Sequence, residues 1–122
     1  MIVAGFGCRA AATPDSLHAA LDAASEGHAA TMLAVPADRL AIARPLADAL
    51  GLPLVGITAD TLAATVTPTR SHASLAARGT GSVAEAAALA AAGPQARLLV
   101  SRRIAPDRMA TCALAISQES RS

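Results

Sequence analysis

Aromatic side chains are nearly missing from this chain. Phe6 is the only one among 122 residues, and there is no tryptophan or tyrosine. Lysine is absent too, so all ten basic residues are arginines, and no basic run is longer than Arg102–Arg103. Proteins that bind nucleic acids usually combine a basic groove with aromatic platforms on which bases stack. The sequence therefore disfavours a nucleic acid as partner.

Cysteine and histidine are also scarce. Cys8 and Cys112 are too few and too far apart for a disulfide framework or a zinc site, and the three histidines are scattered. No apolar stretch approaches the ~18 residues that a membrane span needs, and the first residues lack the basic region and cleavage pattern of an export signal. We expect a cytoplasmic protein with reduced cysteines, no bound metal, no cofactor and no membrane partner.

Alanine dominates the residues that are present, with 34 copies against 31 larger apolar residues. Because an alanine side chain buries little area, the core must gain stability from close approach of helices and sheet. A chain of this length is expected to form one domain, residues 1–117, followed by a polar, disordered tail at 118–122.

Short apolar runs alternate with helical patterns along the chain. The patterns predict strands at 2–6, 31–35, 54–57, 97–101 and 111–116, helices at 14–26, 37–50 and 83–92, and a single helical turn at 58–62. Pro45 is expected to kink or restart the second helix. The connection through Pro106–Asp107 is too short for a helical crossover, so the last two strands should form an antiparallel hairpin. The expected fold is of the α/β class, a three-layer α/β/α domain with a mostly parallel sheet.

The run at 79–89 is the most informative motif. Ser82 and Glu85 have the spacing of a capping box, which satisfies free amides at a helix start, and Gly93–Pro94 marks the helix end. Two glycines precede the serine although a cap does not require them, which indicates close approach of the backbone to another group. We expect the helix tip to face outward, where its amides and positive dipole end would attract a carboxylate or phosphate. A purely structural capped helix is the alternative.

A second glycine motif, Gly5-Phe6-Gly7-Cys8-Arg9-Ala10, follows the first strand and precedes the first helix. It matches a relaxed dinucleotide fingerprint, but Pro36 stands where an acidic residue is expected near the end of the second strand. A nicotinamide or flavin site is therefore disfavoured. We interpret the segment as a glycine turn at the carboxyl end of a strand, where open α/β sheets bind ligands and where Arg9 can reach an acidic group.

The charges are unevenly distributed. Residues 1–65 hold three arginines against six acids, whereas residues 66–122 hold seven arginines against three acids. The basic half contains the 79–89 motif, and the planar guanidinium group suits carboxylates. This pattern favours a small polyanion as ligand.

These motifs resemble those of the family formed by CobE and the C-terminal domain of CbiG proteins, which belongs to cobalamin biosynthesis. They occur in the same order as in that family and extend over nearly the whole chain. The resemblance is carried by residues 5–9, 51–54, 58–62, 79–89 and the final strand with Thr111, and the 79–89 run is the most specific part. The family commonly has lysines where this chain has Arg39 and either Arg102 or Arg103. Charge is kept at both places, but a role specific to lysine would not be.

The resemblance implies a three-layer domain that binds a precorrin or another corrin-ring intermediate, with other enzymes of the pathway as protein partners. Two-domain relatives open a ring lactone and release acetaldehyde, so lactone-opening, hydrolase-type chemistry is expected if this chain is an enzyme. The partner domain of those relatives is not expected here. The implied substrate-binding residues are Gly5, Gly7, Cys8, Arg9, Arg39, Gly79, Thr80, Gly81, Ser82, Val83, Glu85, Arg102 and Arg103.

Three residues are candidates for catalysis, and each has a structural alternative. Glu85 could transfer protons or serve only as a helix cap, and Cys8 could be a nucleophile or a small buried side chain. His72 could reach the site or lie in a solvated loop. Two other functions stay open: a small phosphate- or nucleotide-binding enzyme, and a non-catalytic carrier that shields an intermediate for pathway methyltransferases.

Overall fold

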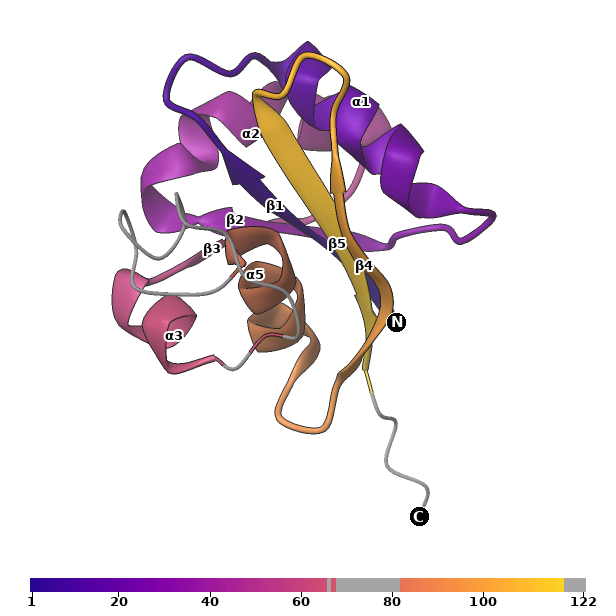
Figure 1. The fold of residues 1–122 in the computed structure, drawn as a ribbon, viewed down its shortest axis with the longest axis vertical. Helices are drawn as coiled ribbons and strands as arrows, with labels where there is room; N and C mark the ends of the chain where they lie inside the picture. The colour runs from indigo at the N-terminus through magenta and orange to yellow at the C-terminus, as the bar shows by residue number, and fades with distance from the viewer. Residues whose placement is uncertain (66, 68–81, 118–122) are drawn as a thin grey trace.

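The chain folds around one five-stranded sheet with helices on both sides (Figure 1). The computed structural model describes residues 1–65, 67 and 82–117. The strands are β1 (Ile2–Cys8), β2 (Met32–Pro36), β3 (Leu54–Ile57), β4 (Arg97–Ile104) and β5 (Ala110–Ile116). They lie in the order β3-β2-β1-β5-β4. β1, β2 and β3 are parallel neighbours, and β5 runs antiparallel to both β1 and β4.

The helices form the two outer layers. They are α1 (Pro14–Ser25), α2 (Leu40–Leu50), α3 (Ala59–Ala64) and α5 (Val83–Ala92), and a 3₁₀ turn, η1 (Ala37–Arg39), precedes α2. Figure 1 shows α1 and α2 on one side of the sheet and α3 and α5 on the other. No helix in the described part of the chain is both long and apolar enough to cross a membrane.

Alternation along β1 divides the core into two parts, because successive strand side chains point to opposite faces. Ala4 and Phe6 belong to the cluster that packs under α1 and α2, and Val3 belongs to the cluster with Ala86 and Ala87 of α5. Phe6, the sole aromatic residue, is fully buried. The α5 side of the core is built mainly from alanine, as the composition predicts.

The predicted fold is confirmed: an α/β domain in three layers, with parallel strands in its first half and a C-terminal antiparallel hairpin. The predicted helix at 83–92 has the observed bounds. Pro45 does not interrupt α2, which runs through it from residue 40 to residue 50 after the η1 turn. The predicted tail at 118–122 lies outside the described residues.

The prediction of a glycine turn at the end of the first strand is wrong. Gly5 and Gly7 do not form a turn, because β1 continues to Cys8 and pairs with β5 along its whole length. The turn was predicted because glycine often ends a strand. The segment is extended instead because it pairs with β5, which lies more than 100 residues later in the sequence and could not be identified as its partner from the local pattern.

Candidate functional site

The glycines of β1 lie on the face that α5 covers. A Cβ atom on Gly5 would overlap the backbone oxygen of Ala84 and the backbone nitrogen of Ala88. A Cβ atom on Gly7 would lie 3.1 Å from the Cβ of Val83 and 3.0 Å from the hydroxyl of Thr111. The close approach that glycine permits is therefore used by the helix, and both glycines are accounted for by packing.

The start of α5 lies against the carboxyl end of β1. Ser82 caps the helix, and its hydroxyl accepts a hydrogen bond from the backbone amide of Glu85 at 3.3 Å. Ser82 is fully buried and Val83 is nearly so. The Ser82 half of the predicted capping box is thus confirmed. The prediction that the helix tip faces outward is wrong, because Ser82 and Val83 are buried and Val83 packs against Gly7.

Glu85 is fully buried, and its carboxylate links α5 to the edge strand β4. Its Oε2 atom accepts a hydrogen bond from the backbone amide of Arg102 at 3.0 Å. That amide is available because β4 carries register shifts between Leu98 and Val100 and between Val100 and Arg103. A bulge of this kind leaves one residue outside the ladder, and a side chain can then satisfy the freed group.

Two guanidinium groups lie at the carboxyl end of β1. Nε of Arg39, which follows β2 in the η1 turn, donates a hydrogen bond to the backbone oxygen of Cys8 at 3.2 Å. Nε of the exposed Arg9 donates to the backbone oxygen of Arg108 at 3.4 Å. Arg39 also lies 3.9 Å from the carboxylate of Asp38, a separation that gives only a weak ion pair. Each contact to a carbonyl uses one of five N–H donors, so the outer edge of each guanidinium can bind an acid.

The turn of the β4–β5 hairpin closes over the same end of β1. The backbone amide of Arg9 donates to the backbone oxygen of Met109 at 2.9 Å. Asp107 accepts from the Ser16 hydroxyl of α1 at 2.6 Å and from the Met109 amide at 2.9 Å. The hydrogen bond from Ser16, and to a smaller extent that from Met109, lowers the pKa of the Asp107 carboxyl below its ordinary value of 3.8.

The structure brings some of the predicted site residues together and separates others. Cys8, Arg9 and Arg39 meet at the end of β1, and Ser82 and Val83 start α5 behind them. The Arg103 guanidinium instead pairs with Glu26, which ends α1. Arg102 lies on β4 and is tied through its amide to Glu85. The predicted residues outside the described part of the chain are His72, Gly79, Thr80 and Gly81.

The hairpin residues were not predicted as part of this region. Pro106–Asp107 signalled a tight connection, but the sequence could not show that the turn would reach Ser16 and Arg9, 91 and 99 residues earlier in the chain. The nucleophile candidate Cys8 is partly buried and packs against the core under α1 and α2. In the same core, burial raises the pKa of the Cys112 thiol far above its ordinary value.

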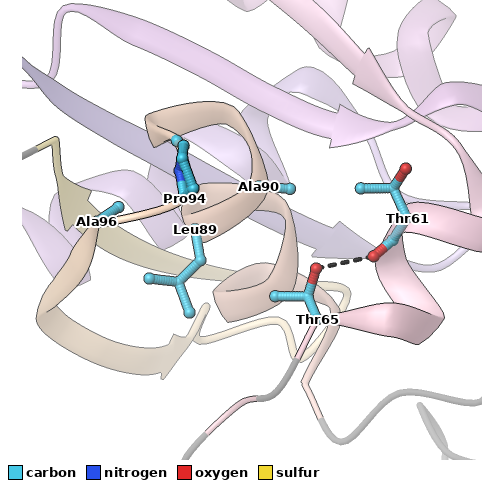
Figure 2. A pocket seen from close by; sticks show the side chains of 7 residues that line it. Thr61, Thr65, Leu89, Ala90, Pro94 and Ala96 are labelled. Atoms are coloured by element: carbon cyan, nitrogen blue, oxygen red, sulfur yellow. Dashed lines mark hydrogen bonds between the residues drawn. The ribbon is translucent and has the colours of Figure 1, made fainter.

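A cavity of about 350 Å³ lies at the opposite end of α5 (Figure 2). It is lined by Thr61, Thr65, Leu89, Ala90, Gly93, Pro94 and Ala96. The Thr65 hydroxyl is already used, because it donates to the backbone oxygen of Thr61 at 2.7 Å. Among the described residues, no group of three histidine, cysteine or acidic side chains could hold a metal ion.

Comparison with known proteins assigns the chain to a family. A family model described as the cobalamin synthesis G C-terminus matches residues 2–115. The crystal structure of CobE, a protein from the cobalamin (vitamin B12) biosynthetic pathway, superposes with a TM-score of 0.82 at 30% identity, over 99% of this chain and 93% of that one. Cobalamin biosynthesis protein chiG from Agrobacterium tumefaciens gives a TM-score of 0.72 at 34% identity, over 98% and 100% of the two chains.

A more distant solved structure shares the fold. It is a cobalamin biosynthesis protein G homolog from Sulfolobus solfataricus, with a TM-score of 0.73 at 17% identity over 96% of this chain and 37% of that one. No curated protein sequence matches the chain. The family match and the two closer structures each span nearly all of the chain. The chain therefore belongs to the CobE and CbiG C-terminal family and is a protein of cobalamin biosynthesis.

Proposed function

We propose that the chain binds a corrin-ring intermediate through the ring's acidic side chains. The proposed site is the carboxyl end of β1, with Cys8, Arg9 and Arg39, in front of the first turn of α5. The observation that carries the proposal is the anchoring of Arg9 and Arg39 by backbone oxygens, at 3.4 Å and 3.2 Å. Open α/β sheets commonly bind ligands at this end of their parallel strands.

The chemistry of the ligand class matches these groups. A precorrin is a large apolar macrocycle surrounded by acetate and propionate carboxylates. A guanidinium that is already held by a backbone oxygen loses less side-chain entropy on binding than a freely moving one, so more of each contact appears as affinity. The two arginines come from different loops, which allows them to bind two carboxylates on one ring.

Helix α5 supports the same site through its dipole, because its first amides are buried and cannot contact a ligand directly. The ten-residue helix points its N-terminus at the end of β1, and a helix N-terminus carries about half a positive charge. That charge favours an anion in front of β1 even though Ser82 and Val83 are covered. Glu85 is assigned a structural role, because its carboxylate is enclosed and holds the Arg102 amide.

Titration with hydrogenobyrinic acid, followed by the absorbance of the corrin, tests the proposal. Arg9→Ala and Arg39→Ala are each expected to raise the Kd at least tenfold, equivalent to about 1.4 kcal/mol, because each removes an anchored guanidinium. Arg44→Ala is the matched control, since Arg44 lies exposed on α2 and should leave the Kd unchanged. Thermal unfolding of each variant separates loss of binding from loss of folding.

A wild-type protein that gives no spectral change at high micromolar ligand would contradict the proposal. Thermal shifts with ATP, NAD and sugar phosphates test the phosphate-binding alternative, because a true ligand at 100 times its Kd stabilises the fold by about 2.7 kcal/mol. Binding without turnover, combined with co-purification of a pathway methyltransferase, would indicate the carrier function.

A further inference from the structure

The tip of the β4–β5 hairpin contains a residue in an unfavourable backbone conformation. Arg108 has a φ of 61°, in the left-handed region that residues with a Cβ atom rarely adopt. The turn is closed by a hydrogen bond of 2.8 Å from the Arg108 amide to the backbone oxygen of Ala105. Glycine or asparagine is the usual residue at such a position. An arginine at this position has a steric cost, and glycine or asparagine would form the same turn with less strain.

The tip is nevertheless fixed from two sides. Asp107 is held by the Ser16 hydroxyl of α1 and by the Met109 amide. Arg9 donates its amide to the Met109 oxygen and its Nε to the Arg108 oxygen. The main chain of Arg108 is therefore in direct hydrogen-bond contact with a residue of the proposed site, and its side chain is exposed. Figure 1 shows this turn beside the loop that joins β1 to α1.

Among the described residues, no acidic side chain forms an ion pair with Arg108. Both oxygens of Asp107 accept hydrogen bonds from uncharged donors, Ser16 and the Met109 amide. Asp38 lies 3.9 Å from Arg39, on the other side of β1. Arg9, Arg39 and Arg108 thus come from three separate segments that hydrogen bonds link at the carboxyl end of β1, through the backbone oxygens of Cys8 and Arg108.

We propose that Arg108 is a third ligand-binding guanidinium, which makes the site selective for a ring with many free carboxylates. The proposal rests on the proposed function and deepens it. Arg9 and Arg39 bind carboxylates near the end of β1, and Arg108 binds a further carboxylate on the same ring from the hairpin side. A ring in which carboxylates have been converted to amides loses charge-assisted hydrogen bonds and binds less tightly.

The decisive variant is Arg108→Gly, titrated with hydrogenobyrinic acid. It removes the guanidinium and relieves the left-handed backbone, so the Kd is expected to rise at least fivefold while the thermal midpoint stays level or increases. Arg108→Asn, which also tolerates this backbone, should give the same loss of affinity. Arg108→Lys keeps the charge without the planar fork and should recover part of it. Arg44→Gln controls for the loss of one positive charge elsewhere.

A second probe tests selectivity. With a derivative of the same ring in which two carboxylates are amides, Arg108→Gly should change the Kd by a smaller factor than with the free acid. If the wild type binds the acid and both Arg108→Gly and Arg108→Asn bind it equally well, the role of Arg108 is refuted and the proposed function stands. If the wild type does not bind the acid at all, the proposed function fails, and the role of Arg108 fails with it.

Discussion

Gly5 allows α5 to pack directly on β1, because a Cβ atom at this position would overlap backbone atoms of Ala84 and Ala88. The sequence predicted a glycine turn at this position, but β1 is extended there and its neighbour is helix α5. The two possibilities cannot be separated from a glycine alone, since both need the absence of a Cβ atom. A turn and close packing are distinguished by whether a helix of small residues packs on the same face, as α5 does here with Ala84 and Ala88.

Replacing Gly5 by alanine should destabilise the protein by about 2 kcal/mol or more. The new Cβ atom would overlap backbone atoms of Ala84 and Ala88, so α5 must shift as a whole, and overpacking of this kind typically costs about 1–3 kcal/mol. Gly7→Ala is the graded control, because its nearest neighbours are the side chains of Thr111 and Val83, at 3.0 Å and 3.1 Å. Urea denaturation measures both. Equal stability of Gly5→Ala and the wild type would contradict the packing argument.

Helix α5 and the irregular strand β4 depend on each other. The sequence predicted the helix bounds, the Ser82 cap and the end of the helix, because capping is a local code. It did not predict that Glu85 would bind the Arg102 amide, because the register shifts that free this amide arise only when β4 pairs with β5. For the same reason, the sequence predicted a site at the carboxyl end of β1 but did not predict that the β4–β5 hairpin would pack over it.

Glu85→Ala should therefore destabilise the protein by about 2 kcal/mol, since it leaves a buried space and removes the acceptor of the Arg102 amide. Glu85→Gln keeps an acceptor oxygen of similar size and should cost less. Hydrogen exchange at the Arg102 amide, followed by NMR, identifies the cause, because this amide should exchange faster in the alanine variant than in the glutamine variant. Identical exchange in all three proteins would show that the bond does not hold β4.

At the scale of the whole molecule, the bond between Ser16 and Asp107 ties the first helix to the last hairpin. It lowers the pKa of the folded-state carboxyl below 3.8, so its contribution is present above the unfolded-state pKa and is lost as pH falls through the folded-state pKa. Asp107→Asn should reduce stability near neutral pH, and its difference from the wild type should shrink below about pH 4. Urea titrations at several pH values test this. A difference independent of pH would exclude the carboxylate as its source.

The pairing of the first strand with the last has a consequence for how the protein is made. Ile2 lies opposite Ile116, and β5 is inserted between β1 and β4. On the ribosome, β1, β2 and β3 can associate early, but β1 keeps one edge without hydrogen bonds until the final strand has emerged. The nascent chain thus exposes an unpaired strand edge, which can associate with other chains, until residues 110–116 have left the ribosome, and the sheet is completed only after that point.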